Sequence, residues 1–216
     1  SFVRPVGVGG WDADFRNGVV QQWNVSMQRQ FFDSWVLQAA YVANKGNHLE
    51  TTRQDNPGVF GRPGSLQQRR IYPDFSAIGL SSSQGNATYH SMQLSANRRF
   101  TRGLTLMASY TWAKGIDNLT NPQDGFNFSR EKARSDLNIA HRVVGSFIWE
   151  MPRFRNLPRA ARFAIDGWSV NGIVSLESGL PFNVVSGRDN TGTGINADRP
   201  NLIGDPRLST DRTRGE

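Results

Sequence analysis

The sequence has 216 residues, of which 37% are hydrophobic and 11% aromatic, and its 22 glycines and 10 prolines favour strands and turns over helices. It contains no cysteine, which excludes disulfides, thiol catalysis and cysteine metal sites. The net charge of +7 comes mainly from arginines in the predicted connections, such as Arg98-Arg99, and not from one basic face with interleaved aromatic residues, so nucleic acid is not an expected partner.

The longest apolar run covers residues 39–43, whereas a membrane-spanning helix needs about 20 apolar residues. A spanning helix is therefore excluded. Barrel strands remain possible, because only every second residue of such a strand is apolar. Alternation with a period of two predicts six strands, at residues 22–31, 35–43, 89–98, 104–112, 142–151 and 168–178.

The first four predicted strands form two hairpins. Residues 32–34 join the first pair and residues 99–103 join the second. The strand at residues 104–112 reads LTLMASYTW, with large apolar residues on the even positions and mostly Thr and Ser on the odd ones. Met107 is the exception, and on the polar side it is expected to touch a plug residue or another side chain of the lumen.

The last two predicted strands alternate less strictly. Val144 and Ile148 interrupt the polar side of one, and Ile173 interrupts that of the other. The 16-residue basic connection between them, residues 152–167, stands where a short turn is expected.

Connection lengths alternate between short and long. The segments between residues 43 and 89 and between residues 112 and 142 are long and rich in Asn, Asp, Gly and Ser. Outer-membrane barrels have this asymmetry, with tight periplasmic turns and long external loops. Aromatic residues also mark both ends of the apolar side, as the two interfaces of a bilayer select. One predicted girdle contains Trp35, Trp149 and Trp168, and the other contains Trp23, Tyr110 and Trp112.

The two sides of the strands predict two environments. The side expected to face lipid, girdles included, carries Trp23, Trp35, Tyr41, Met92, Leu94, Leu104, Leu106, Tyr110, Trp112, Phe147, Trp149, Trp168, Val170 and Leu176. The side expected to face the lumen carries Asn24, Ser26, Gln93, Ser95, Asn97, Thr105, Ser109, Thr111, Asn171, Ser175 and Glu177. Small neutral residues suit a wet lumen, whereas exposed sheets of soluble proteins usually carry Lys and Glu. The pattern alone leaves a soluble β-sandwich as an alternative.

The expected fold is all-β, an antiparallel transmembrane β-barrel segment of about six or more strands with long extracellular loops. Six strands do not close an outer-membrane barrel, which needs about eight. The chain is therefore expected to be part of a larger barrel. A first residue other than Met and a polar end at residues 214–216 fit that expectation.

Several segments resemble a known family. From Tyr89 onward, YHSMQLSANRRFTRGLTLMASYTWAKGIDN, AHRVVGSFIWEMP, GWSVNGIVSLESGLPFNV and NADRPNLIGDP are similar to consecutive parts of the C-terminal half of the barrel in TonB-dependent receptors. The subgroup they resemble most is the Oar-like one, whose members carry an N-terminal carboxypeptidase-regulatory-like domain. QQWNVSMQRQF and AAYVANKGNHL resemble the preceding hairpin, so the similarity covers essentially the whole chain.

The resemblance implies a barrel of about 22 strands with a plugged lumen in the outer membrane of a Gram-negative bacterium. Residues 1–216 would form part of that one barrel domain, without the plug or the segment that contacts TonB. The implied partners are outer-membrane lipid, the rest of the barrel and its plug, the TonB system and an unidentified solute. The implied function is solute passage and surface recognition. The alternative is a surface adhesin or a structural component without transport.

No catalytic pattern emerges, and neither an enzyme activity nor a cofactor is expected. His48, His90 and His141 lie far apart in sequence without metal-ligand spacing, and the GxSxG of serine hydrolases is absent. Residues 189–194 superficially resemble a calcium loop but lack its regular Asp/Asn alternation and its closing Glu, so a Gly/Asn turn is expected there. Among the predicted lumen residues, Glu177 is a candidate partner for plug arginines.

Overall fold

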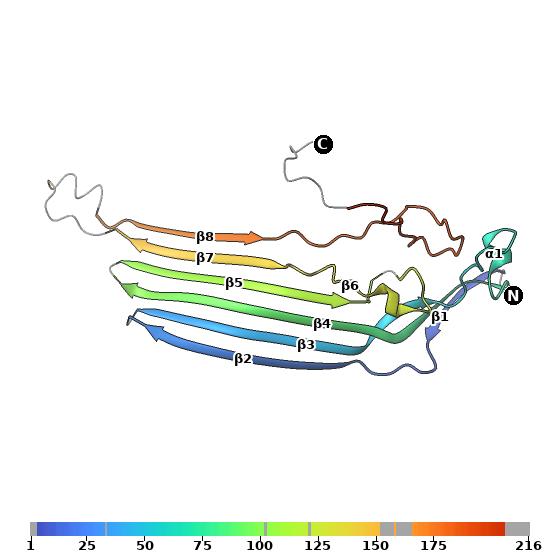
Figure 1. The fold of residues 1–216 in the computed structure, drawn as a ribbon, viewed down its shortest axis with the longest axis horizontal. Coiled ribbons are helices and arrows are strands. Elements are labelled where there is room, and N and C mark those ends of the chain that lie inside the picture. Colours follow the sequence, from blue (N-terminus) through green and yellow to red (C-terminus); the bar gives the residue numbers. More distant parts are fainter. Residues whose placement is uncertain are drawn as a thin grey trace.

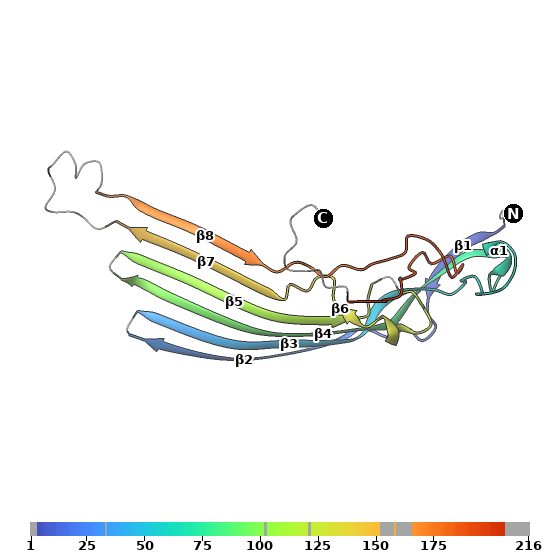
Figure 2. The same cartoon turned by 45° about the horizontal axis from the view of Figure 1, so that its top comes forward.

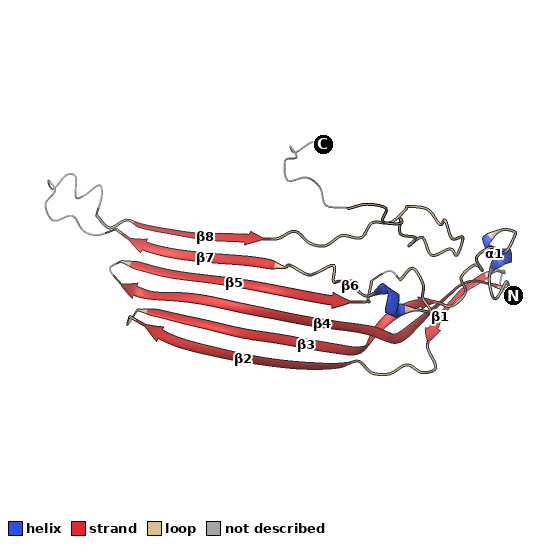
Figure 3. Ribbon diagram, in the orientation of Figure 1, coloured by secondary structure: helices blue, strands red, loops and turns tan. Residues whose placement is uncertain are grey.

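The computed structural model describes residues 4–32, 34–101, 103–120, 122–151, 158 and 166–205. Strands dominate it (Figure 3). They are β1 (Val6–Trp11), β2 (Val19–Phe31), β3 (Trp35–Gln54), β4 (Phe75–Thr101), β5 (Leu104–Asp117), β6 (Ala133–Arg134), β7 (His141–Glu150) and β8 (Ser169–Glu177). The helices are α1 (Leu66–Arg69) and a 3-10 turn, η1 (Phe128–Glu131). Among the described residues, no helix has both the length and the apolar character that crossing a membrane requires.

The strands form one sheet in the order β2-β3-β4-β5-β7-β8, with every adjacent pair antiparallel. β1 pairs in parallel with β4, and β6 pairs with β5. Two views of the molecule show a single curved layer with β2 and β8 at its edges (Figures 1 and 2). The described part of the sheet is open and has no second sheet packed against it, so the sandwich alternative is wrong.

The two ends of the sheet differ, as predicted. Residues 32–34 connect β2 to β3, residues 102–103 connect β4 to β5, and β7 and β8 meet at the same end, here called the short-turn end (Figure 1). Long segments emerge at the opposite end, here called the loop end. Gly103 makes the β4–β5 turn possible: its φ is 80°, and a Cβ there would lie 2.6 Å from the carbonyl oxygen of Glu150. Nearly all of the unusual connection at residues 152–167 lies outside the described residues.

β3 and β4 are longer than predicted. They contain 20 and 27 residues, whereas about 9–11 suffice to cross a bilayer. The predicted strand ends at residues 43 and 89 are therefore wrong, and β1 and β6 were not predicted at all. Beyond a membrane a strand has no need of an apolar side, so its alternation ends while its pairing continues, for example between Thr51 and Ser82. Register shifts around Leu49 mark this upper part of β3.

Candidate solute-contact site on the polar face

The register brings the predicted lumen residues onto one face of the sheet. In one row across it, Gln93 pairs with Thr111, Thr111 with Arg142, and Arg142 with Glu177. Side chains paired across antiparallel strands point to the same side. This side, here called the polar face, carries Asn24, Ser26, Gln93, Ser95, Asn97, Thr105, Ser109, Thr111, Asn171, Ser175 and Glu177. That it lines a lumen remains a prediction, as does the contact expected of Met107, which is 55% exposed on this face.

The opposite side, here called the apolar face, carries the residues predicted to meet lipid. In one row Tyr41 pairs with Met92 and Met92 with Trp112. Only Trp168 falls outside a strand, directly before β8. From Leu104 to Trp112, β5 runs about 27 Å, which at a tilt of about 40° gives roughly 21 Å of height. That height is close to the apolar band of about 25 Å typical of outer-membrane barrels. The contact with lipid remains a prediction.

A cavity of about 430 Å³ lies on the polar face near the loop end. Its floor includes Tyr89, Gln93, Thr111 and Arg142, and the segment at residues 135–139 lines it from the loop side. Asn138 holds this segment in place, because its Oδ1 accepts a hydrogen bond from the backbone N–H of Gly115. The cavity therefore brings two predicted lumen residues together with a loop that periodicity did not place there.

Arg142 and Glu177 form an ion pair beside this cavity. Nε of Arg142 lies 3.0 Å from Oε1 of Glu177, and the two side chains are 53% and 38% exposed. The partner of Glu177 in the described structure is thus a neighbouring strand, whereas the sequence suggested a plug arginine. The register explains the pair, since the two residues stand directly opposite each other on β7 and β8.

The loop-end segments are joined by buried polar groups. Glu131 is 6% exposed and accepts hydrogen bonds from the backbone N–H groups of Gln123 and Asp124 and from Arg199. These contacts connect the segment after β5 with the segment after β8. A cavity of about 390 Å³ lies between them, lined by Pro57, Gln123, Asp124, Gly125, Phe126, Arg130, Glu131, Thr191, Thr193, Ile195 and Arg199.

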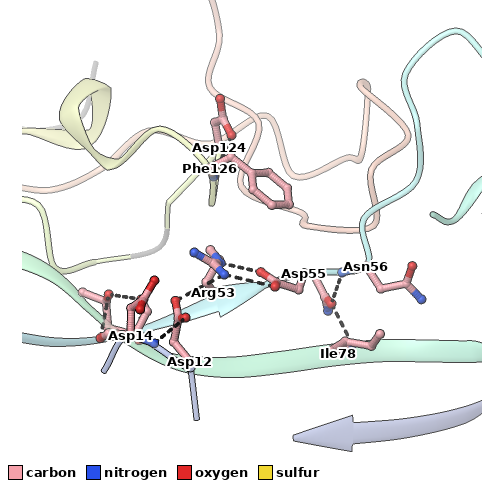
Figure 4. A network of polar contacts seen from close by, with 11 residues as sticks. Asp12, Asp14, Arg53, Asp55, Asn56, Ile78, Asp124 and Phe126 are labelled. Atoms are coloured by element: carbon pink, nitrogen blue, oxygen red, sulfur yellow. Dashed lines mark hydrogen bonds and ion pairs between the residues drawn. The ribbon is translucent and has the colours of Figure 1, made fainter. Parts of the chain in front are cut away.

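Arg53 is the centre of a second network at the loop end (Figure 4). Its guanidinium pairs with Asp55 and with Asp12, the residue after β1, and lies over the ring of Phe126, with Cζ 5.8 Å from the ring centroid. The hydrogen bond to Asp55 and the negative charges of Asp55 and Asp12 raise the pKa of Arg53, although burial opposes the shift. The network ties β1 to the upper end of β3.

Asn56 is fully buried next to this network. Its Nδ2 donates to the carbonyl oxygens of Tyr72, Phe75 and Ser76 at 3.0–3.1 Å, and its Oδ1 accepts from the N–H of Tyr72. One side chain thus joins the beginning of the connection between β3 and β4 to its end.

Residues 189–194 form a turn held by carboxylates. Asp189 accepts hydrogen bonds from the N–H groups of Thr193 and Gly194, and Asp198 accepts from the N–H and the hydroxyl of Thr191. The backbone hydrogen bond from Thr191 lowers the pKa of Asp198, against the effect of burial. All four carboxylate oxygens of Asp189 and Asp198 accept hydrogen bonds from N–H or O–H groups, as in a hydrogen-bonded turn.

Two of the histidines are paired with tyrosines on the apolar face. The hydroxyl of Tyr41 lies 2.7 Å from Nδ1 of His90, and that of Tyr110 lies 2.9 Å from Nδ1 of His141. His48 has a φ of 56° in the irregular part of β3. In the described residues, no three His, Asp or Glu side chains are grouped as a metal site would need.

Comparison with known proteins explains the two faces. The family model described as "Outer membrane beta barrel domain" matches residues 1–216. The chain belongs to this family. Its sheet is therefore a segment of an antiparallel transmembrane β-barrel in the bacterial outer membrane, and the loop end is extracellular.

A solved structure with a similar fold is the outer membrane transporter YddB from Escherichia coli, with a TM-score of 0.54 and 11% sequence identity over 84% of this chain. The matched region is 23% of that transporter, and at this identity the likeness concerns the fold alone. No match was found among curated proteins.

Sequence reasoning missed two parts of this outer-membrane segment. The fold of residues 135–139 onto the polar face rests on contacts such as Asn138 with Gly115, which leave no periodic trace in the sequence. The pair of Arg142 and Glu177 did leave a signal. Arg142 begins one predicted strand, Glu177 is the second-to-last residue of the next, and pairing those two strands antiparallel places the opposite charges face to face.

Proposed function

We propose that the chain is part of the barrel of a TonB-dependent receptor of the Oar-like subgroup, where its polar face contacts a passing solute and its loops take part in surface recognition. The cavity of about 430 Å³ on the polar face is the observation that carries the proposal. Hydroxyl, amide and guanidinium groups of Tyr89, Gln93, Thr111 and Arg142 line its sheet side, and Leu137 and Ile139 add apolar surface from the loop side. Such walls suit a hydrated, polar solute.

The remaining parts of the proposal follow from the sequence resemblance. The partners are outer-membrane lipid, the rest of the barrel with its plug, and the TonB system, which acts through parts of the receptor other than these residues. We propose no enzyme activity, no cofactor and no nucleic-acid partner. The likeness to an outer membrane transporter supports the proposal at the level of the fold.

Cysteine labelling tests the proposal, because the chain has no cysteine of its own. Single cysteines at Gln93 and Leu94, in the intact protein without other reactive thiols, are exposed to a membrane-impermeant maleimide on cells with and without a working TonB system. We expect the Gln93→Cys variant to label, and to label faster when TonB moves the plug. The Leu94→Cys variant, one residue along on the other face, should stay unlabelled. Equal labelling of Gln93→Cys with and without TonB would contradict the coupling.

A role without transport, as a surface adhesin or structural component, is favoured by one observation. β3 and β4 continue well past the girdles and carry a network of buried polar groups outside the membrane. Filling the cavity with Thr111→Trp separates the two functions. In a receptor, this substitution should abolish transport. In an adhesin, it should leave surface binding unchanged. Only the loss of transport supports the receptor.

A further inference from the structure

Two arginines lie on the apolar face near the short-turn end. Arg29 of β2 pairs with Leu37, and Arg98 of β4 pairs with Trp35. The sequence predicted Arg98 as the last residue of a strand, and β4 continues beyond it to Thr101. Arg98 stands at the level of the girdle residue Trp35, and Arg29 lies one step along the apolar face toward the other girdle.

Both guanidinium groups converge on one pair of aromatic rings. Cζ of Arg29 lies 5.2 Å from the ring centroid of Phe31, and Cζ of Arg98 lies 5.7 Å from that of Trp35. Phe31 and Trp35 are themselves paired across β2 and β3, which places their Cβ atoms about 5 Å apart. Two positive charges are therefore directed to one place on the sheet.

Within the described residues, no carboxylate neutralises these charges. Neither arginine takes part in a salt bridge there, and Nε of Arg98 is buried without a hydrogen-bond partner. A guanidinium next to lipid is costly unless it reaches an anion or water. An anion that contacted both guanidinium groups would neutralise this charge on the apolar face.

A shallow apolar groove of about 680 Å³ adjoins Arg29 and the ring of Phe31. Ala39, Ala96 and Ala108 are small residues of the apolar face in three adjacent strands, and Arg29 is the one charged residue of its lining. The larger apolar side chains along it are Met27, Phe31, Leu37, Leu94, Tyr110 and Val143. The groove offers an acyl chain a place beside Arg29.

We infer that Arg29 and Arg98 bind the phosphate of a glycerophospholipid whose acyl chain lies in this groove. The inference rests on the prediction that the apolar face meets lipid, and it is independent of transport. The short-turn end of an outer-membrane barrel lies on the periplasmic side, where the leaflet consists of glycerophospholipids. Guanidinium groups suit phosphate oxygens because they donate several hydrogen bonds in a planar fork.

Native mass spectrometry of the intact protein in mild detergent, titrated with phosphatidylglycerol, tests the inference. Each single variant, Arg29→Gln or Arg98→Gln, should weaken lipid binding roughly fivefold, and the double variant should weaken it roughly thirtyfold. Arg62→Gln removes an exposed arginine of the loop end and should change nothing. The glutamine variants are expected to assemble as well as the parent, since they remove charge from the membrane.

Two further measurements distinguish a lipid site from a general phosphate site. Ala96→Leu should fill the groove and weaken binding of phosphatidylglycerol while both arginines remain. Inorganic phosphate at equal concentration should not displace the lipid. Unchanged lipid binding by the double variant, or full displacement by inorganic phosphate, would overturn the inference.

Discussion

The membrane-spanning part of the sheet and the loop end place their side chains in opposite ways. Between the girdles, large apolar side chains are exposed: Val25 is 70% and Met27 77% exposed. At the loop end the most deeply buried side chains are polar, and Asn56 and Ser82 are both 0% exposed. Apolar side chains are therefore exposed in the spanning part, whereas polar side chains are buried at the loop end.

The difference reflects two solvents. On the prediction that lipid surrounds the spanning part, apolar side chains there gain nothing by turning inward, and strand pairing satisfies the backbone. Water surrounds the loop end, where few apolar side chains are available to form a core. There, buried polar groups stabilise the chain because each donor or acceptor has a hydrogen-bond or ion-pair partner, as around Asn56 and Arg53. One region depends on the bilayer for its stability and the other depends on the completeness of its polar network.

A charge in the middle of the apolar face should have the largest effect. Leu94→Arg places a guanidinium between Ala39 and Tyr110, at a cost of roughly 2–4 kcal/mol if the position is near the midplane. We expect outer-membrane assembly to fall strongly, as measured by the heat-modifiable folded fraction. Ser95→Arg, one residue along on the polar face, should assemble normally. The reverse outcome would show that the two faces have been assigned to the wrong solvents.

Loss of a loop-end polar group should act locally. Asn56→Ala leaves the N–H of Tyr72 without its acceptor and the carbonyl oxygen of Ser76 without this donor, while the carbonyl oxygens of Tyr72 and Phe75 keep other donors, and the loss costs about 1–3 kcal/mol. We expect faster hydrogen exchange at Tyr72 and proteolysis within residues 55–74, with barrel assembly unchanged. Asn86→Ala, which removes an exposed asparagine, is the matched control. A loss of assembly equal to that of Leu94→Arg would show that the two regions are not independent.

The sequence predicted the spanning part well for a physical reason. A strand with lipid on one side and a polar lumen on the other must alternate, so six strands and the two sets of residues could be read from residues such as Leu94 and Ser95. Their distribution between two faces follows from the observed register. The difference between the two ends of the sheet was likewise visible in the connection lengths.

The loop end was predicted poorly because nothing there imposes a period. The upper parts of β3 and β4 pair through residues such as Thr51 and Ser82, which have no apolar side to signal a strand. The role of Asn56 depends on carbonyl oxygens that lie 16 to 20 residues away in the sequence. The strand predicted to end at Arg98 was too short by three residues for the opposite reason, because charged residues next to a turn resemble a loop even when they belong to a strand.

Acid should affect the loop end more than the spanning part. Because the pKa of Asp198 is below its unfolded value of 3.8, its hydrogen bonds to Thr191 stabilise the segment at neutral pH. That contribution declines as the pH falls below about 3.8 and is lost once the pH passes the folded-state value. We expect the protection factor of the Thr191 amide against hydrogen exchange to fall in this range, and Asp198→Asn to remove the dependence. A protection factor that stays constant down to pH 2 would contradict this assignment.

The ion pair of Arg142 and Glu177 should have the smallest effect, since both side chains are substantially exposed on the polar face. Water and salt screen such a pair, and a coupling of roughly 0.2–1 kcal/mol is expected from a double-mutant cycle of Arg142→Gln and Glu177→Gln on unfolding in detergent. High salt should abolish it. The loop-end pair of Arg199 and Glu131, whose glutamate side chain is 3% exposed, should couple more strongly and resist salt. A salt-resistant coupling at Arg142 and Glu177 as large as that of the loop-end pair would mean that the polar face excludes water, and this part of the barrel would then be packed against protein rather than lining a wet passage.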